Sequence, residues 1–144
     1  MDKKIVIGCD HAGFDYKEMI KKYVLNNGFQ VEDKGCFSKD SVDYPDFAHQ
    51  VGQTLNNDVN KRGILVCGSG NGVNIVANKY NNVRSALCWN EEIALLARQH
   101  NNANCIAIPA RFISEDEAKK IVAAFLNTAF EGGRHQTRVD KIAC

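Results

Sequence analysis

Short apolar runs rich in β-branched residues alternate along the chain with segments in which apolar residues recur every three or four positions. The apolar runs predict strands at 4–9, 29–33, 63–67, 83–88 and 105–108. The periodic segments predict helices at 14–25, 46–55, 74–80, 91–99 and 115–130, followed by a last short helix within 134–144. Strands that alternate with helices in this way indicate an α/β fold with a parallel sheet.

The run at 63–67 is the most continuously apolar, so we expect it at the centre of the sheet. Right-handed crossovers and the length of 144 residues favour a three-layer, doubly wound, Rossmann-like domain with strand order 2-1-3-4-5. We expect a single domain over residues 1–144, because 44% hydrophobic residues at this length can form one core. In such a sheet a ligand binds beyond the carboxyl ends of the first and third strands, where the strand order reverses.

Composition and charge argue against several classes of protein. Lysine and arginine number 18 against 17 acidic residues, and this net charge of +1 offers no bulk attraction to nucleic acid or to an anionic membrane. The longest uncharged apolar runs, about five to seven residues, are too short to span a membrane. The first residues lack the apolar stretch of a secretory signal, so we expect none there. We therefore expect a cytoplasmic protein.

The cysteines form no C-x-x-C pair, which argues against a zinc or redox motif. Several of them end apolar runs, which is typical of buried thiols in a reducing compartment. The six are Cys9, Cys36, Cys67, Cys88, Cys105 and Cys144.

Residues capable of acid–base chemistry follow the first and third predicted strands. Asp10 and His11 come after the first strand, and Cys67 ends the third directly before the glycine-rich loop 68–72. The glycines let backbone N–H groups face an anion at the start of the next helix. Val73 takes the place of the third glycine of a dinucleotide-binding fingerprint, so that pattern is only partial. A tight turn without a ligand is the alternative.

Cys67 differs from the other cysteines because it precedes both this loop and a helix start. The helix dipole and free N–H groups are expected to favour its thiolate and to lower its pKa, so that it could act as a nucleophile or a base. A thiol packed in the core is the alternative. Arg134 and Arg138 lie four residues apart and could grip a phosphate from one helix face, with Arg111 joining them, unless they are simply solvated.

Six segments, in the same order and spacing, resemble the ribose/galactose sugar-phosphate isomerase family, which includes type B ribose-5-phosphate isomerases. They are GCDHAGF at 8–14, DYP at 43–45, CGSGNG at 67–72, ANK at 77–79, RQHN at 98–101 and EGGRHQTR at 131–138. The resemblance runs from about residue 4 to about residue 142 and therefore covers nearly the whole chain.

This resemblance implies interconversion of ribose 5-phosphate and ribulose 5-phosphate, a step of the pentose phosphate pathway, without metal or organic cofactor. It makes Cys67 the base that moves a proton between C2 and C1 through a cis-enediolate, while His100, aided by Asp10, opens the furanose ring. Ser69 and the loop amides would hold the negative oxygen. The implied substrate contacts are His11, Tyr44, Gly68, Gly70, Asn71, Gly72, Asn101, Arg111, Arg134 and Arg138.

Two positions depart from the family pattern. Val73 stands where some members carry a glutamate base, and Ser69 stands where many cysteine-type members have threonine.

The family further implies a homodimer or a tetramer with shared active sites, and the segment 131–144 is expected at the dimer interface. An allose-6-phosphate or galactose-6-phosphate isomerase remains an alternative. A non-catalytic nucleotide- or phosphate-binding module is a more distant one.

Overall fold

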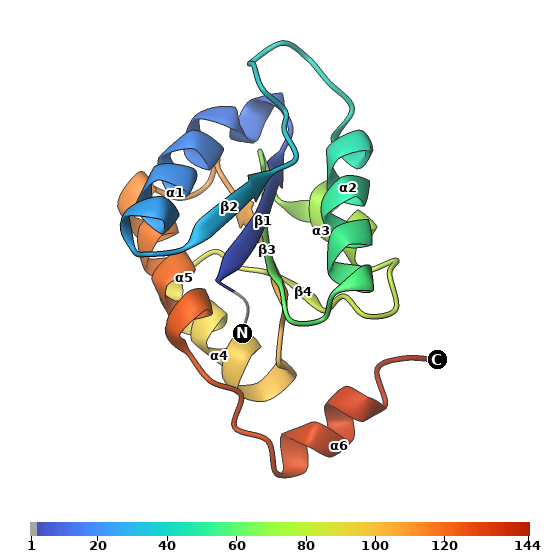
Figure 1. The fold of residues 1–144 in the computed structure, drawn as a ribbon. Helices are drawn as coiled ribbons and strands as arrows, with labels where there is room; N and C mark the ends of the chain where they lie inside the picture. The colour runs from blue at the N-terminus through green and yellow to red at the C-terminus, as the bar shows by residue number, and fades with distance from the viewer. Residues whose placement is uncertain (1–2) are drawn as a thin grey trace.

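The computed structural model describes residues 3–144 and contains one sheet of parallel strands with helices on both faces (Figure 1). The strands are β1 (Lys4–Cys9), β2 (Gln30–Asp33), β3 (Arg62–Cys67), β4 (Ser85–Leu87) and β5 (Cys105–Pro109). All five strands are parallel, as the alternation of strand and helix predicts. The α/β class is therefore confirmed.

The helices follow the sequence periodicity closely. They are α1 (Phe14–Asn26), α2 (Tyr44–Asn57), α3 (Asn71–Ala77), α4 (Glu91–Asn101), α5 (Glu115–Asn127) and α6 (Arg134–Asp140), with a short 3-10 turn η1 (His11–Gly13) before α1. Helix α3 begins earlier than its apolar pattern predicts, because Gly70 has φ +77° and turns the chain from β3 directly into the helix. Among residues 3–144 no helix combines the length and apolarity needed to cross a membrane.

The strand order is β2-β1-β3-β5-β4, so the predicted order is wrong at one edge of the sheet. Strand β5 pairs with β3 and β4 forms the edge, whereas the expected order placed the fourth strand beside the third and the fifth at the edge. The physical reason is burial: β5 is completely buried, while the three residues of β4 are only partly buried and suit an edge. The reversal between β1 and β3, where a ligand is expected, is as predicted.

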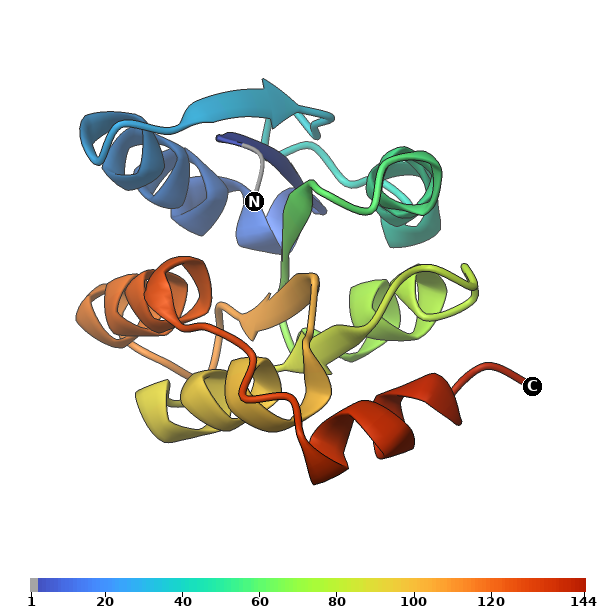
Figure 2. The same cartoon turned by 60° about the horizontal axis from the view of Figure 1, so that its bottom comes forward.

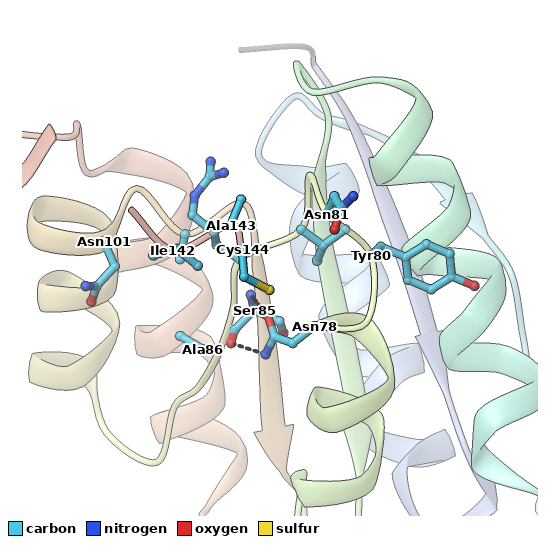
Figure 3. A pocket seen from close by; sticks show the side chains of 12 residues that line it. Asn78, Tyr80, Asn81, Ser85, Ala86, Asn101, Ile142, Ala143 and Cys144 are labelled. Carbon is cyan, nitrogen blue, oxygen red and sulfur yellow. Dashed lines mark hydrogen bonds between the residues drawn. The ribbon is translucent and has the colours of Figure 1, made fainter. Parts of the chain in front are cut away.

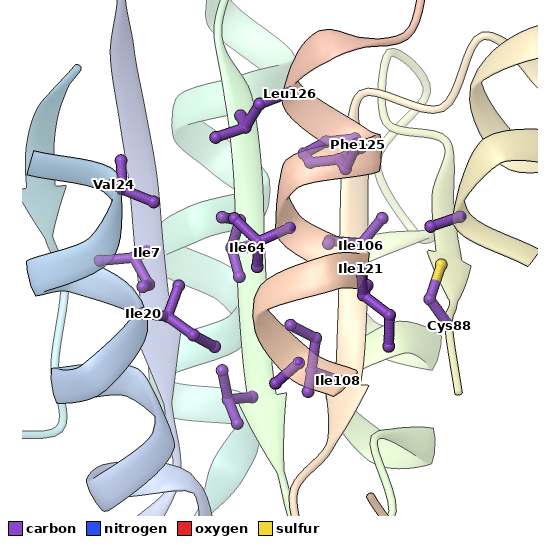
Figure 4. Packing of buried hydrophobic residues seen from close by; sticks show 14 of the residues in the cluster. Ile7, Ile20, Val24, Ile64, Cys88, Ile106, Ile108, Ile121, Phe125 and Leu126 are labelled. Carbon is purple, nitrogen blue, oxygen red and sulfur yellow. The ribbon is translucent and has the colours of Figure 1, made fainter. Parts of the chain in front are cut away.

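Alternate side chains of the strands point to two separate apolar layers. On one face, Phe125 and Ile121 of α5 pack over Ile64, Ile106 and Ile108 of the sheet, with α1 and α4 on either side (Figure 4). On the other face, helices α2 and α3 pack over the intervening residues of the same strands. Burial of these apolar surfaces stabilises the three-layer arrangement and fixes the ends of the strands in space.

Helix α6 differs from the other helices because it does not cover the sheet. It follows α5 and extends along the outside of the molecule, where its neighbour is α4 (Figure 2). His135 is the buried residue of this helix, while Arg134 and Arg138 are exposed. The exposed side of α6 is therefore available to contact another protein molecule.

Candidate active site

A pocket of about 560 Å³ lies beyond the carboxyl ends of β1 and β3. This is the position where the strand order reverses. Its lining includes eight of the residues expected from the sequence: Asp10, His11, Tyr44, Cys67, Gly68, Ser69, Gly72 and Arg111. Ala12 and Phe112 complete the lining; neither was among the expected site residues.

Asp10 and His11 are held where β1 leaves the sheet. The Asp10 carboxylate accepts a hydrogen bond from Gly13 N at 3.0 Å and so caps the following turn. This turn packs closely against β3 because residue 13 is glycine: a Cβ atom there would be 2.5 Å from Val66 O. His11 Nδ1 accepts a hydrogen bond from Val42 N at 3.2 Å. Because Nδ1 is an acceptor, the neutral imidazole carries its hydrogen on Nε2.

Cys67 ends β3 at the floor of the pocket, and the residue is 6% exposed. Gly70 N donates to it at 3.1 Å. Burial raises the pKa of Cys67, and the nearby Asp10 carboxylate adds to this; backbone hydrogen bonds from Val73, Gly70 and Ser69 lower it without compensating. The expectation of a lowered pKa is therefore wrong, because desolvation of the thiolate outweighs the amide dipoles.

The loop between β3 and α3 satisfies several of its own donors. Gly70 N points at the Cys67 sulfur and Asn71 N donates to Ser69 Oγ at 3.2 Å. Gly72 packs directly against the Tyr44 ring, since a Cβ atom at position 72 would lie 2.4 Å from Tyr44 Cε1. The loop N–H groups are therefore directed at the Cys67 sulfur, and the Tyr44 ring forms one side of the pocket.

Arg111 brings a positive charge to the same pocket. Its backbone N donates to Gly68 O at 3.0 Å, which fastens the segment after β5 to the loop after β3. Its guanidinium group lies over Gly68, where a Cβ atom would be 3.3 Å from Nη1. Together with the Nε2 hydrogen of His11, this group can bind an anion at the pocket mouth.

Six expected site residues are outside this lining: Gly70 and Asn71 belong to the same loop, and the other four lie elsewhere in this chain. His100, in the last turn of α4, stacks on His135 of α6, with ring centroids 4.2 Å apart. Arg134 and Arg138 lie on α6. Asn101 lines a separate pocket of about 370 Å³, in which the residues from Ile142 to Cys144 lie beside β4 (Figure 3). One copy of the chain therefore does not assemble the whole set.

His100, Glu131 and His135 are a group of possible metal ligands within residues 3–144, with ligand atoms within 4.8 Å of one another. The two imidazole rings are nearly parallel, at 11°. A metal ion binds in the plane of each imidazole, so stacked rings do not direct both nitrogen lone pairs at one ion. As it stands, this group does not form a ready metal site.

A buried ion pair between α1 and the end of β2 was missed by the sequence analysis. Lys17 is completely buried, and its Nζ donates to both Asp33 carboxylate oxygens, at 2.9 and 2.8 Å, and to Cys36 O at 2.7 Å. These bonds anchor the start of the segment that carries Val42 to His11. Helical spacing could have indicated that Lys17 is buried, because it lies on the same face of α1 as Ile20 and Val24.

Comparison with known proteins points to one family. A family model described as Ribose/Galactose Isomerase matches residues 5–142. Ribose-5-phosphate isomerase B of Escherichia coli (strain K12) is 43% identical over 97% of this chain and 94% of its own. D-Erythrulose-4-phosphate isomerase of Pectobacterium atrosepticum is 41% identical over 96% of this chain and 91% of its own. Ribose-5-phosphate isomerase B of Mycoplasma genitalium, crystallised with bound ribulose-5-phosphate, has a TM-score of 0.93 at 43% identity, covering 96% of this chain and 93% of that chain.

Proposed function

Because the chain belongs to the ribose/galactose isomerase family, we propose that it interconverts ribose 5-phosphate and ribulose 5-phosphate in this pocket. The observation that carries the proposal is the position of the Cys67 sulfur, at the floor of the pocket with backbone N–H groups directed at it. The relative from Mycoplasma genitalium, whose fold matches over nearly the whole chain, is described with bound ribulose-5-phosphate.

In the proposed reaction Cys67 acts as the base on the open-chain sugar. Its thiolate takes the proton from C2, the C–H electrons form the C1–C2 double bond, and the carbonyl electrons move to O1. The C2 hydroxyl proton then passes to O1, the O–H electrons form the C2 carbonyl, and the electrons of the C1–C2 double bond take the proton back from the thiol at C1. The reaction moves protons within one substrate and balances without an oxidant or a reductant.

The loop amides have a role in both halves of this step. In the thiolate form, the N–H groups of Ser69, Gly70 and Val73 stabilise the charge on sulfur. Once sulfur is protonated, the negative charge lies on the enediolate oxygen beside it, and these dipoles and the Ser69 hydroxyl can stabilise it there. Because the same N–H groups stabilise the negative charge on sulfur and then on the neighbouring enediolate oxygen, they lower the free-energy barrier of the proton transfer.

His11 and Arg111 are proposed to bind the phosphate group. The His11 ring and the Arg111 guanidinium group line the same pocket as Cys67. Tyr44 packs against Gly72 of the loop in the same pocket and is proposed to hold a sugar hydroxyl. Binding at the remote phosphate fixes the reacting carbons against Cys67.

The residues missing from the pocket are proposed to come from a second copy in a homodimer. Arg134, Arg138 and Asn101 are exposed, and His100 is 40% exposed at the end of α4. Helix α6 extends away from the sheet (Figure 2), which supports a place for segment 131–144 at an interface. In this arrangement His100 of one copy would open the ring next to Asp10 of the other, and the two arginines would add to the phosphate site.

Mixing two inactive variants tests this sharing. Cys67→Ala and His100→Ala proteins are unfolded together and refolded, so that mixed dimers form. If sites are shared, half of the mixed dimers' sites are intact, and activity recovers to about a quarter of the native value. If each chain builds its whole site, no intact site exists and no activity returns.

The base is tested by Cys67→Ala, with Cys105→Ala as the matched control. Cys105 is completely buried and lies at the amino end of β5, outside the pocket. We expect Cys67→Ala to lose about 10²- to 10⁴-fold in kcat, the usual contribution of a general base, and to keep its affinity for ribose 5-phosphate in calorimetry. Exchange of the C2 proton in heavy water should fall in parallel. Native turnover in this variant would exclude Cys67 as the base.

The length of the sugar is the open part of the substrate specificity. The 41% identical relative is named for a four-carbon substrate, so overall similarity does not decide the sugar. Comparing kcat/KM for ribose 5-phosphate, allose 6-phosphate, galactose 6-phosphate and erythrulose 4-phosphate tests the choice; a preference for any of the last three would replace the five-carbon assignment.

We also place the protein in the cytoplasm, which is consistent with its six free thiols.

A further inference from the structure

A second polar pocket, of about 200 Å³, lies at the opposite end of the sheet from the catalytic pocket. Arginines from three elements line it: Arg62 begins β3, Arg84 precedes β4, and Arg98 lies in the last turn of α4. The other lining residues are Val59, Asn60, Lys61, Asn102 and Asn104. Arg62 and Cys67 are five strand steps apart, which corresponds to about 17 Å.

Within the described part of the chain, the three guanidinium groups have no acidic partner. Among residues 3–144 no carboxylate lies within 4.0 Å of any of them. The nearest ion pair at this pocket joins Lys61 to Glu32, at 3.7 Å. Three positive charges therefore share one pocket without a full negative charge to neutralise them.

Backbone carbonyl groups hold the arginines in place. Arg98 Nε donates to Thr128 O at 2.9 Å and its Nη1 donates to Ala103 O at 2.6 Å. Arg84 Nε donates to Asn102 O at 3.0 Å. Arg62 bonds the carbonyl groups at the end of α5. Helix carboxyl ends carry only partial negative charges, about half an elementary charge each, so they position these cations without neutralising them.

Arg98 is the most buried of the three arginines, with 5% of the residue exposed. Burial lowers the pKa of Arg98 to about 10, and the charges of Arg62 and Arg84 contribute to the shift. Donors remain free at the same time: both terminal nitrogens of Arg84 and Nη2 of Arg98 have no acceptor among the described residues. The pocket thus combines unbalanced charge with unused N–H groups.

We propose that the pocket between Arg62, Arg84 and Arg98 binds a phosphate group, either as inorganic phosphate or on a small phosphorylated metabolite. A tetrahedral oxyanion matches the planar fork of guanidinium donors and would supply the missing negative charge. The site is independent of the proposed isomerisation, since it uses none of the catalytic residues and lies at the other end of the sheet.

Arg84→Gln tests the site, because Arg84 is only partly buried and anchors the fold through one bond from Nε. Lys120→Gln is the matched control, since it removes an equal charge from the exposed face of α5. Calorimetry with inorganic phosphate, at constant ionic strength set with chloride, should detect a binding event in native and Lys120→Gln proteins besides that at the catalytic pocket. We expect it to weaken at least about tenfold in Arg84→Gln. Circular dichroism checks that each variant is folded.

Crystals soaked in tungstate, a heavy tetrahedral oxyanion, locate the ion directly. We expect anomalous density beside the three arginines in native and Lys120→Gln crystals, and its loss in Arg84→Gln. Density only at the catalytic pocket, or equal density in Arg84→Gln, would overturn the proposal. A parallel titration with glycerol 3-phosphate separates the two sources: binding of both probes indicates an organic phosphate ligand, and binding of inorganic phosphate alone indicates the free ion.

Discussion

Substituting alanine for Gly72 should weaken substrate binding without weakening the fold. The new Cβ atom would lie 2.4 Å from Tyr44 Cε1 and 2.6 Å from Cζ, whereas carbon atoms in contact are normally about 3.5 Å apart. The Tyr44 ring must therefore move by about 1 Å. It can do so because Tyr44 is 40% exposed. Gly72 lies in the first turn of α3, where alanine is the better helix former by up to about 1 kcal/mol.

The functional cost follows from the hydrogen bond that Tyr44 is proposed to make. Loss of a neutral hydrogen bond costs about 0.5–1.5 kcal/mol, so kcat/KM should fall about two- to twelvefold, mainly through KM. The assay compares isomerase kinetics of Gly72→Ala, Tyr44→Phe and the double variant, with urea unfolding of each. In the double variant Gly72→Ala should add nothing to Tyr44→Phe. Unchanged kinetics, or effects that multiply in the double variant, would refute this reasoning.

Three further predictions concern titration and burial. The raised pKa of Cys67 means that thiolate accumulates with pH, so kcat/KM should rise about tenfold per pH unit from pH 7 to 9; a flat profile would argue against thiolate chemistry. Burial raises the pKa of both Cys88 and Cys105 to about 12. These thiols stay protonated in the folded state while unfolded thiols ionise, so above about pH 9 the free energy of unfolding should fall by about 1.4 kcal/mol per pH unit for each thiol. In urea titrations at pH 8, 9 and 10, Cys105→Ala should show a shallower decline than the native protein, and equal slopes would contradict the assignment. Lys17→Met removes the completely buried partner of Asp33 and should cost about 3 kcal/mol in urea unfolding at pH 7; a change below about 1 kcal/mol would mean that the pair contributes little.

The elements themselves were readable from the sequence because their signals are local. Continuous apolar residues predicted β1, β3 and β5, and helical periodicity predicted the helices that cover them. The order of β4 and β5 was not readable. Either order satisfies a right-handed crossover, and the outcome depends on which strand gains more by burial on both faces.

The core of the candidate site was also predictable, because Asp10, His11 and Cys67 follow adjacent strands of a parallel sheet, whose carboxyl ends meet at one edge. The direction of the Cys67 pKa shift was not predictable. A helix start is visible in sequence and lowers a thiol pKa, but desolvation depends on the packing of every neighbouring element.

By itself, the sequence determined the fold class, the family resemblance and the catalytic loop, since each depends on residues close together in the chain. Tertiary structure alone decided which distant groups meet: Val42 against the His11 ring, Lys17 against Asp33, and three arginines around one cavity. It also separated Arg134 and Arg138 from the pocket of their own chain. Proximity, burial and uncompensated charge arise only when remote segments pack together, and no local pattern of residues encodes them.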